Sequence, residues 1–371
     1  MSERVATSGR RGDRPGRSHL RGRPVAVIAA TLIAAVAILG VTACGGDSGA
    51  KGTATTTSKK GTSTTADTGE GDTPAALMTA VCEGAPKITD AGEVDTPLVN
   101  EASGLVASWS NTGDGADGVW WIHNDSGSAP AIFAINGRGQ LLATVALEGA
   151  EARDWEDIAV GPPAVAGGPS QLYVGDIGNN KAMLGDATAR GSVRVYRLDE
   201  PVVPTEPPAA GSVAPVVTAN VTTFSLRYPD KPYDAEAMVV DPVRGDIWII
   251  TKDWERAGKS LLFRMPKAAE IAEGTSIDML PAGEVPLEPG TLVTSADVTR
   301  DGSLVALRSY GAVDLYRRPS GKKLSAAFGT TPCGGPVPNE VQGESVAFAP
   351  DGGSYLTVSE GDKPMLHRTS P

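Results

Sequence analysis

One short pattern recurs five times along the chain, and this repeat restricts the possible folds more than any other feature. Each copy has an apolar strand, a turn, a second strand that ends in polar residues, and a third strand. The copies begin at Glu101, Glu156, Glu236, Ala296 and Glu344, which are 55, 80, 60 and 48 residues apart. A four-stranded blade with its loops needs about 40–50 residues. The spacing therefore predicts a ring of similar sheets, a β-propeller.

Fourth strands are expected in four of the copies, near residues 141–147, 221–226, 277–285 and 324–328. The fifth copy lacks one, and the earlier segment Lys87–Val94 can supply it, which closes the ring without an open edge. We therefore predict an all-β fold, a single β-propeller of five blades closed by an N-terminal strand. Six blades are the alternative. A β-sandwich is the structural rival, but it does not predict five similar strand starts.

Composition and charge narrow the classes of protein. The 45 glycines and 28 prolines are typical of a turn-rich β protein, and the stretch Pro201–Pro215 is interpreted as an insertion in the longest copy. A net charge of −11 argues against a nucleic-acid partner, which requires a basic surface. Three histidines leave little material for a multi-histidine metal site.

The N-terminal residues have the organisation of an export signal. Residues 1–24 carry seven arginines, and the next 17 residues, Val25–Val41, are uncharged and apolar. The run ends in Val41-Thr42-Ala43-Cys44-Gly45, which resembles the bacterial lipobox, where a peptidase cuts before a cysteine that carries a diacylglycerol. An uncleaved anchor helix is the alternative. We predict a signal peptide over 1–43, lipidation at Cys44, and a position outside the cytoplasm on the bacterial cell membrane.

The segment after Cys44 predicts a spacer without a fold. Lys51–Thr73 holds nine threonines in 23 residues and no large apolar side chain, so it cannot bury enough surface to offset its ordering entropy. We predict a disordered tether over 44–76 and the propeller over 77–371.

Two cysteines remain in the predicted propeller. Cys82 and Cys333 are 251 residues apart, and a pair of cysteines in a protein outside the cytoplasm usually forms a disulfide. We expect this bond to tie the closing strand to the last blade. Two buried free thiols are the alternative.

The runs Asp154–Ala159, Tyr173–Asn180 and Gly343–Phe348 resemble those of secreted bacterial β-propellers, a broad group with NHL-like, SMP-30-like and phytase-like members. The resemblance covers most of the predicted domain and implies the architecture. It does not select an activity, because such propellers serve as binding proteins, lactonases, phosphatases and scaffolds.

Propeller geometry, as the resemblance implies it, places the starts of inner strands and the ends of second strands on one face near the axis. This face is the expected ligand site. The candidate residues are Glu101, Asp125, Glu156, Asp157, Asp176, Asn179, Glu236, Arg308, Glu344 and Glu360.

Three interpretations of this face stay open. Carboxylate and amide oxygens such as those of Asp125, Asp157, Asp176 and Asn179 suit Ca²⁺, although no EF-hand spacing is present. Paired carboxylates or a metal-held water can catalyse hydrolysis. In the third interpretation the acids bond backbone N–H groups or basic side chains and only organise the ring. The repetition of the glutamate favours the structural interpretation.

Three further side chains are candidates for ligand binding. His123 can act as a base and Trp155 and Trp254 can stack on a sugar, but each residue type more often packs or hydrogen-bonds in a strand end. The sequence therefore predicts a lipid-anchored propeller that binds a small molecule or protein, with a metal-assisted hydrolase of the phytase or lactonase kind as the alternative.

Overall fold

A computed structural model describes residues 73–371 apart from 113–117, 186–187, 267–270 and 272–274, and these lie in one compact unit, Thr65–Pro371. The predicted signal peptide, Cys44 and residues 44–72 of the predicted tether lie outside the described residues. Within the described part of the chain, no helix has the length and apolar character needed to cross a membrane.

The strands of the described residues form five separate sheets, which confirms the five-bladed propeller and shows that the six-bladed alternative is wrong. Blade one contains β2 (Ala102–Ala107), β3 (Val119–Asn124), β4 (Ala131–Asn136), β5 (Leu141–Glu148) and β9 (Val216–Asn220). Blade two contains β6 (Asp157–Gly161), β7 (Gln171–Asp176), β8 (Val193–Asp199), β10 (Thr222–Arg227) and β14 (Ser276–Asp278).

The other three blades have four strands each. Blade three contains β11 (Ala235–Val240), β12 (Ile247–Thr251), β13 (Lys259–Met265) and β15 (Leu280–Pro286). Blade four contains β16 (Val293–Val298), β17 (Leu304–Ser309), β18 (Ala312–Arg317) and β19 (Cys333–Gly335). Blade five contains β20 (Gly343–Phe348), β21 (Tyr355–Ser359), β22 (Met365–Ser370) and β1 (Lys87–Glu93).

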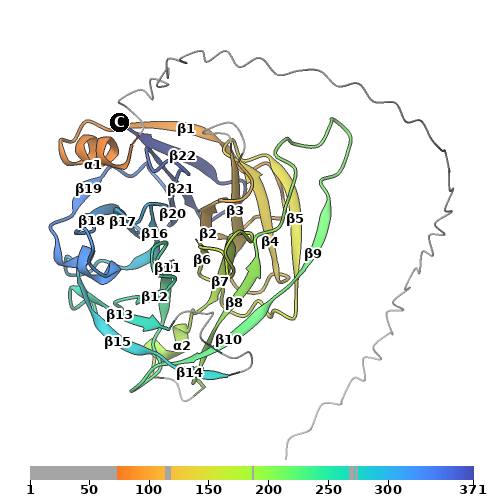
Figure 1. Cartoon of the computed structure of the whole chain (residues 1–371). Coiled ribbons are helices and arrows are strands. Elements are labelled where there is room, and N and C mark those ends of the chain that lie inside the picture. The colour runs from red at the N-terminus through yellow and green to blue at the C-terminus, as the bar shows by residue number, and fades with distance from the viewer. Residues whose placement is uncertain (1–72, 113–117, 186–187, 267–270, 272–274) are drawn as a thin grey trace, which may run out of the picture. The chain divides into compact units, whose positions relative to one another are not determined.

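The ring closes as the sequence predicted. β1 pairs antiparallel with β22, so the first strand of the domain completes the last blade, and Figure 1 shows the orange β1 beside the dark blue β22. The inner strands β2, β6, β11, β16 and β20 contact one another in sequence around the axis, and β20 returns to β2. These strands are almost completely buried, because each packs between its own blade and two neighbours.

Two strands extend blades beyond the expected four. After the Pro-rich insertion, β9 pairs in parallel with β5 of blade one, and the chain then crosses to blade two as β10. The short β14 pairs in parallel with the outer side of β10. The insertion between the second and third copies therefore lengthens the outer edge of blade one, and β14, which comes from the third copy, lengthens that of blade two.

One predicted strand is wrong. Leu324–Gly329 forms a 3₁₀ helix, η3, and the fourth strand of blade four is β19, which contains Cys333. Leu324, Ala327 and Phe328 are buried, and their three- and four-residue spacing places them on one side of a helical turn against Tyr316. Cys333 consequently belongs to blade four, not to the last blade as expected.

The predicted disulfide is confirmed between Cys82 and Cys333, and the alternative of free thiols is wrong. Cys82 ends the helix α1 (Pro74–Cys82), which the hydroxyl of Thr73 caps by accepting a hydrogen bond from the backbone N–H of Ala76. Leu77 of α1 is buried against side chains of blades four and five. The helix begins inside the segment 44–76, so ordered structure starts before residue 77.

Candidate functional site

The inner strands begin with a local irregularity that turns one side chain toward the axis. The pairing of the first two strands slips at Glu236, at Thr294 and at Glu344, the signature of a β-bulge. Glu156 directly precedes the inner strand of blade two, and Ser103 lies in the slipped segment of blade one. The equivalent positions therefore carry glutamate in three blades and a hydroxyl in two.

This alignment corrects two predicted starts. Ser103 and Thr294, not Glu101 and Ala296, occupy the position of the glutamates. The Oγ of Ser103 donates to the carbonyl oxygen of Glu156 at 2.6 Å, and the Oγ1 of Thr294 donates to the carbonyl oxygen of Gly343 at 3.1 Å. The two hydroxyls therefore join neighbouring blades, while the glutamates are left to face the axis.

A cavity of about 150 Å³ lies at this end of the axis, and residues of all five blades line it. Its lining comprises Ser103, Asp125, Glu156, Asn180, Glu236, Lys252, Trp254, Tyr310, Gln342, Glu344 and Glu360. Five of the ten predicted site residues thus meet in one cavity: Asp125, Glu156, Glu236, Glu344 and Glu360. We call the carboxylates of these five residues, with those of Asp154 and Asp234, the acidic face.

The other five predicted residues do not line the cavity. Glu101 is exposed just before β2. Asp157 is fully buried between inner strands, where its carboxylate accepts hydrogen bonds from the backbone N–H groups of Met238 at 2.8 Å and Ala296 at 3.2 Å. Its role fits the structural interpretation, because it links blade two to blades three and four.

Asp176, Asn179 and Arg308 are held by partners that the sequence did not indicate. Arg190 donates to the Oδ1 of Asp176 at 2.6 Å, and the side chain of Asn179 bonds the backbone of Arg190 in both directions. Arg308 is buried in an ion pair with Glu340. These three side chains organise loops around the acidic face.

Two carboxylates of the acidic face were missed from the sequence. Asp154 and Asp234 stand two residues before Glu156 and Glu236, so the motif Asp-x-Glu occurs in blades two and three. Gln342 has the same place before Glu344. This shared spacing was the available signal, and it places a second polar group beside each axial glutamate.

Glu156 belongs to two groups of carboxylates that are close enough to hold a metal ion. One oxygen from each of Asp125, Asp154 and Glu156 lies within 4.8 Å of the others, and the same holds for Glu156, Asp234 and Glu236. We call these sets the first triad and the second triad. Carboxylate oxygens at such separations suit a hard cation such as Ca²⁺.

The second triad is already supplied with donors. The Nζ of Lys252 donates to both carboxylate oxygens of Glu236 at 2.5 Å. The carboxylate of Asp234 accepts from the backbone N–H of Asn179 at 2.6 Å and from the indole N–H of Trp254 at 2.5 Å. Although burial alone would lower the pKa of Lys252, Glu236 raises it above its ordinary value, so the ammonium stays charged.

The first triad has almost no hydrogen-bond donors. Among the described residues, no side chain or backbone N–H donates to the carboxylate of Glu156 or Asp154, and the Oδ1 of Asp125 accepts only from the adjacent backbone N–H of Ser126. Glu156 is nevertheless only 5% exposed. An isolated buried carboxylate is costly, so this arrangement calls for a cation or for protons.

Titration of the acidic face reflects this lack of compensation. Burial raises the pKa of Glu156 well above its ordinary range, and the charges of Glu236 and Asp125 raise it further. Burial also raises the pKa of Asp125 to about 6 and that of Glu344 to about 7. Protons and cations therefore compete for the carboxylates of the acidic face close to neutral pH.

A glycine backs the first triad. A Cβ atom on Gly178 would lie 2.0 Å from the Oε1 of Glu156 and 2.8 Å from the Oδ2 of Asp154. Only a residue without a side chain leaves these two carboxylates where they are. The Asp176–Arg190 pair holds the same loop, since Asp176 also accepts from the backbone N–H of Asp154 at 3.0 Å.

His123 and Trp155 pack in the interior, as their residue types predicted. Both are almost fully buried, with ring centroids 5.6 Å apart, and burial lowers the pKa of His123 to about 4. Trp254 differs, since it is half-buried and also lines a neighbouring cavity of about 570 Å³. Tyr233, Lys231 and Leu261 also line that cavity.

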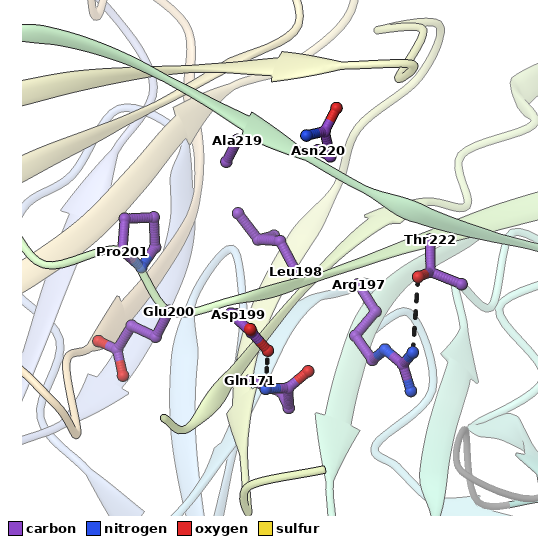
Figure 2. A pocket seen from close by; sticks show the side chains of 9 residues that line it. All are labelled: Gln171, Arg197, Leu198, Asp199, Glu200, Pro201, Ala219, Asn220 and Thr222. Carbon is purple, nitrogen blue, oxygen red and sulfur yellow. Dashed lines mark hydrogen bonds between the residues drawn. The ribbon is translucent and has the colours of Figure 1, made fainter. Parts of the chain in front are cut away.

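A cavity of about 440 Å³ lies where the chain crosses from β9 to β10 (Figure 2). Its polar side chains are bonded within the protein: Gln171 donates to Asp199 at 2.7 Å, and Arg197 reaches Thr222 at 3.5 Å. Glu200, also in its lining, accepts from the indole N–H of Trp121 at 2.8 Å. These partners give the cavity a structural explanation.

Comparison with known proteins adds little to the site. No protein-family model matches the chain, and no curated protein matches it. The chain is similar to the solved structure of XC5397, a gluconolactonase from Xanthomonas campestris, with a TM-score of 0.40 and 12% identity over 81% of this chain and 94% of that one. A similarity of this size carries no conclusion about activity, and the five-bladed architecture rests on the strand pairing itself.

Proposed function

We propose that the protein is a lipid-anchored, extracytoplasmic binding module whose acidic face holds a divalent cation, with Ca²⁺ as the expected ion. One observation carries the proposal. The carboxylate of Glu156 is buried beside Asp125 and Asp154, and no donor among the described residues compensates it.

The residues of the first triad fit such an ion. Three carboxylates supply hard oxygen ligands, and the adjacent cavity leaves room for water or for a ligand oxygen. When bound, the cation would supply a positive charge that attracts anionic or hydroxylated ligands to the axis. Glu156 and Asp154 would be among its ligands, and Gly178 leaves their carboxylates the space they occupy.

The experiment compares thermal unfolding and calorimetric titration of the purified protein with Ca²⁺ and with EDTA. An ion that binds only the folded state at 100 times its Kd stabilises that state by about 2.7 kcal/mol. We expect this stabilisation for the wild type and for Glu148→Gln, which removes an exposed carboxylate of β5. Identical melting temperatures in Ca²⁺ and EDTA, with no heat of binding, would reject the cation site.

The lipid anchor is tested separately. Acylation of Cys44 would hold an acidic domain at a membrane that its own surface does not attract. Replacement of Cys44 by alanine should abolish both lipid labelling and cleavage before residue 44. Unchanged labelling with a radioactive fatty acid would refute the anchor while leaving the cation site untouched.

A second candidate function is hydrolysis, which one observation favours. Burial raises the pKa of Glu344 to about 7, and this carboxyl lines the same cavity as Glu156 and Asp125. A carboxyl that titrates near neutral pH can take a proton from water as a general base. Turnover of lactones, esters or phosphomonoesters that EDTA abolishes and Glu344→Gln lowers would establish an enzyme. Absence of turnover on all three leaves the binding module.

A further inference from the structure

The two triads of the acidic face share Glu156, which is the arrangement of a site for two neighbouring cations bridged by one carboxylate. The first triad adds Asp125 and Asp154 to Glu156, and the second adds Asp234 and Glu236. By carboxylate count alone, the acidic face offers two positions of equal charge. The two positions differ in burial, since all three residues of the second triad are buried and only Glu156 of the first is, and in what already contacts them.

The ammonium group of Lys252 lies against the second triad. The Nζ of Lys252 lies 2.5 Å from each oxygen of Glu236 and donates to the hydroxyl of Tyr310 at 2.8 Å, which uses all three of its N–H bonds. The same Nζ lies 4.9 Å from the ring centroid of Trp254 and 4.8 Å from that of Tyr310. The side chain of Lys252 is 3% exposed.

We propose that Lys252 is a built-in cation that fills the second triad and limits the acidic face to one divalent ion, bound at the first triad. This inference rests on the proposed function. A dication at the second triad would need the oxygens of Glu236, both of which Lys252 already holds. Its contacts with Tyr310 and Trp254 also hold the ammonium in this position.

The contrast with the first triad supports this division. No lysine or arginine forms an ion pair with Asp125, Asp154 or Glu156 among the described residues. The second triad therefore already holds a positive charge from the chain itself, and the first triad is left for an ion from solution. Lys252 determines how many ions bind, rather than whether one binds.

The test counts Ca²⁺ ions per chain by calorimetry and by equilibrium dialysis with metal analysis. Lys252→Met keeps the apolar stem and removes the charge, so it should raise the count from one to two. Lys259→Met is the matched control, because Lys259 is half-exposed and pairs at 2.6 Å with Glu284, which is not a carboxylate of the acidic face. It should bind one ion. The double variant Lys252→Met with Glu236→Gln removes both partners and should also bind one.

Each outcome bears on the proposal. If wild type and Lys252→Met each bind one ion, the proposal for Lys252 is overturned and the cation site remains. Two ions in wild type have the same consequence. No ion in any protein overturns the proposed function together with this inference. Lys252→Met leaves Glu236 unpaired and can unfold without metal, in which case Ca²⁺ should restore the melting transition with two ions bound. A variant that stays unfolded in Ca²⁺, beside a folded double variant, also overturns the proposal.

Discussion

Two buried carboxylates stand next to each other in the chain and have opposite surroundings. Asp157 lies inside the ring and accepts hydrogen bonds from the N–H groups of Ile158, Met238 and Ala296 and from the hydroxyl of Ser295. Glu156 lines the axial cavity, and its carboxylate accepts no hydrogen bond from the described residues, although its backbone carbonyl accepts one from Ser103. Strand alternation separates them, because successive side chains point to opposite sides.

The two neighbouring carboxylates differ in whether hydrogen bonds compensate their burial. Buried polar groups in proteins are almost always hydrogen-bonded, and Asp157 follows that rule as a link between three blades. Asp297 does the same between blades four and five, where it accepts from the backbone N–H of Phe348 at 2.7 Å. Glu156 breaks the rule at the place where a ligand can reach it. The ring interior and the acidic face should therefore respond differently to the same loss of charge.

The largest expected effect is on the ring interior. In Asp157→Asn an amide nitrogen replaces one oxygen, and it cannot accept from the N–H groups of Met238 and Ala296, which share that oxygen. Each buried donor left without a partner costs about 1–3 kcal/mol, so we expect a loss of about 2–6 kcal/mol in the free energy of unfolding. Urea denaturation measures it.

The folded fraction of Asp157→Asn should still bind Ca²⁺ with wild-type affinity. If this variant instead loses Ca²⁺ binding and keeps its stability, Asp157 binds the ion and does not stabilise the ring.

The next effect is on the acidic face. Glu156→Gln removes a carboxylate shared by both triads, and we expect the affinity for Ca²⁺ to fall at least about 100-fold, because loss of even a group that only orients a metal ligand costs about 10- to 100-fold. Without Ca²⁺ the variant should be at least as stable as the wild type, since no hydrogen bond is lost and an uncompensated charge disappears. Calorimetry and thermal unfolding in EDTA measure the two quantities. A stability loss like that of Asp157→Asn would show that Glu156 is structural as well.

The repeat was enough to predict the ring, because blade-sized spacing and strand patterning are local properties of the chain. It was not enough to align the copies, because residues two apart lie on the same face of a strand and the alternating pattern does not distinguish them. The sequence thus predicts Glu101 as the equivalent of Glu156, and the structure places Ser103 there, two residues further on. The 3₁₀ helix η3 was missed for a similar reason, as its short apolar run suits a strand or a helical turn.

The composition of the acidic face was only partly predictable. Side chains at strand ends were found, but their partners come from distant loops, as Arg190 does for Asp176 and Glu340 does for Arg308. Such pairings depend on the tertiary structure, and the spacing of the residues in the sequence does not predict them. Asp154 and Asp234 are different, because their common distance from Glu156 and Glu236 is visible in the sequence.

The third effect concerns pH. The folded-state pKa values of Asp125, about 6, and Glu344, about 7, exceed their ordinary values, so the folded protein without metal holds more protons than the unfolded chain. Their contribution to stability is complete below pH ~4 and is lost as the pH rises through 6 to 7. Cation binding depends on pH in the opposite direction: it strengthens as the pH rises, because the ion needs ionised ligands.

We therefore expect Ca²⁺ affinity at least about 10-fold weaker at pH 5 than at pH 8, since a carboxyl with a pKa near 6 is only about one-tenth ionised at pH 5. Calorimetry at the two pH values measures the change. Asp157 does not line the cavity, so this pH dependence should persist in Asp157→Asn. Equal affinity at both pH values would place the ion away from the first triad.

A smaller effect is expected behind the first triad. Gly178→Ala places a methyl group against Glu156 and Asp154 and must displace them, which we expect to weaken Ca²⁺ binding about 10-fold. Gly191→Ala is the control, because a Cβ there meets no atom within 4 Å. It should match the wild type. Equal affinities of the two variants would show that the position of Glu156 does not matter for the ion.

The smallest effect tests whether binding depends on contact or on the general field of negative charge. Glu101 is exposed, and its charge helps to raise the pKa values of Asp125 and Glu360 without lining the cavity. Glu101→Gln should therefore weaken Ca²⁺ binding less than about 3-fold, and the difference should vanish in 1 M salt, where the Debye length is only ~3 Å. Titrations at low and high salt, beside Glu156→Gln, measure both. If Glu101→Gln weakens binding as strongly as Glu156→Gln, the ion is held by diffuse attraction, and the contrast between Glu156 and its neighbours has no meaning for the site.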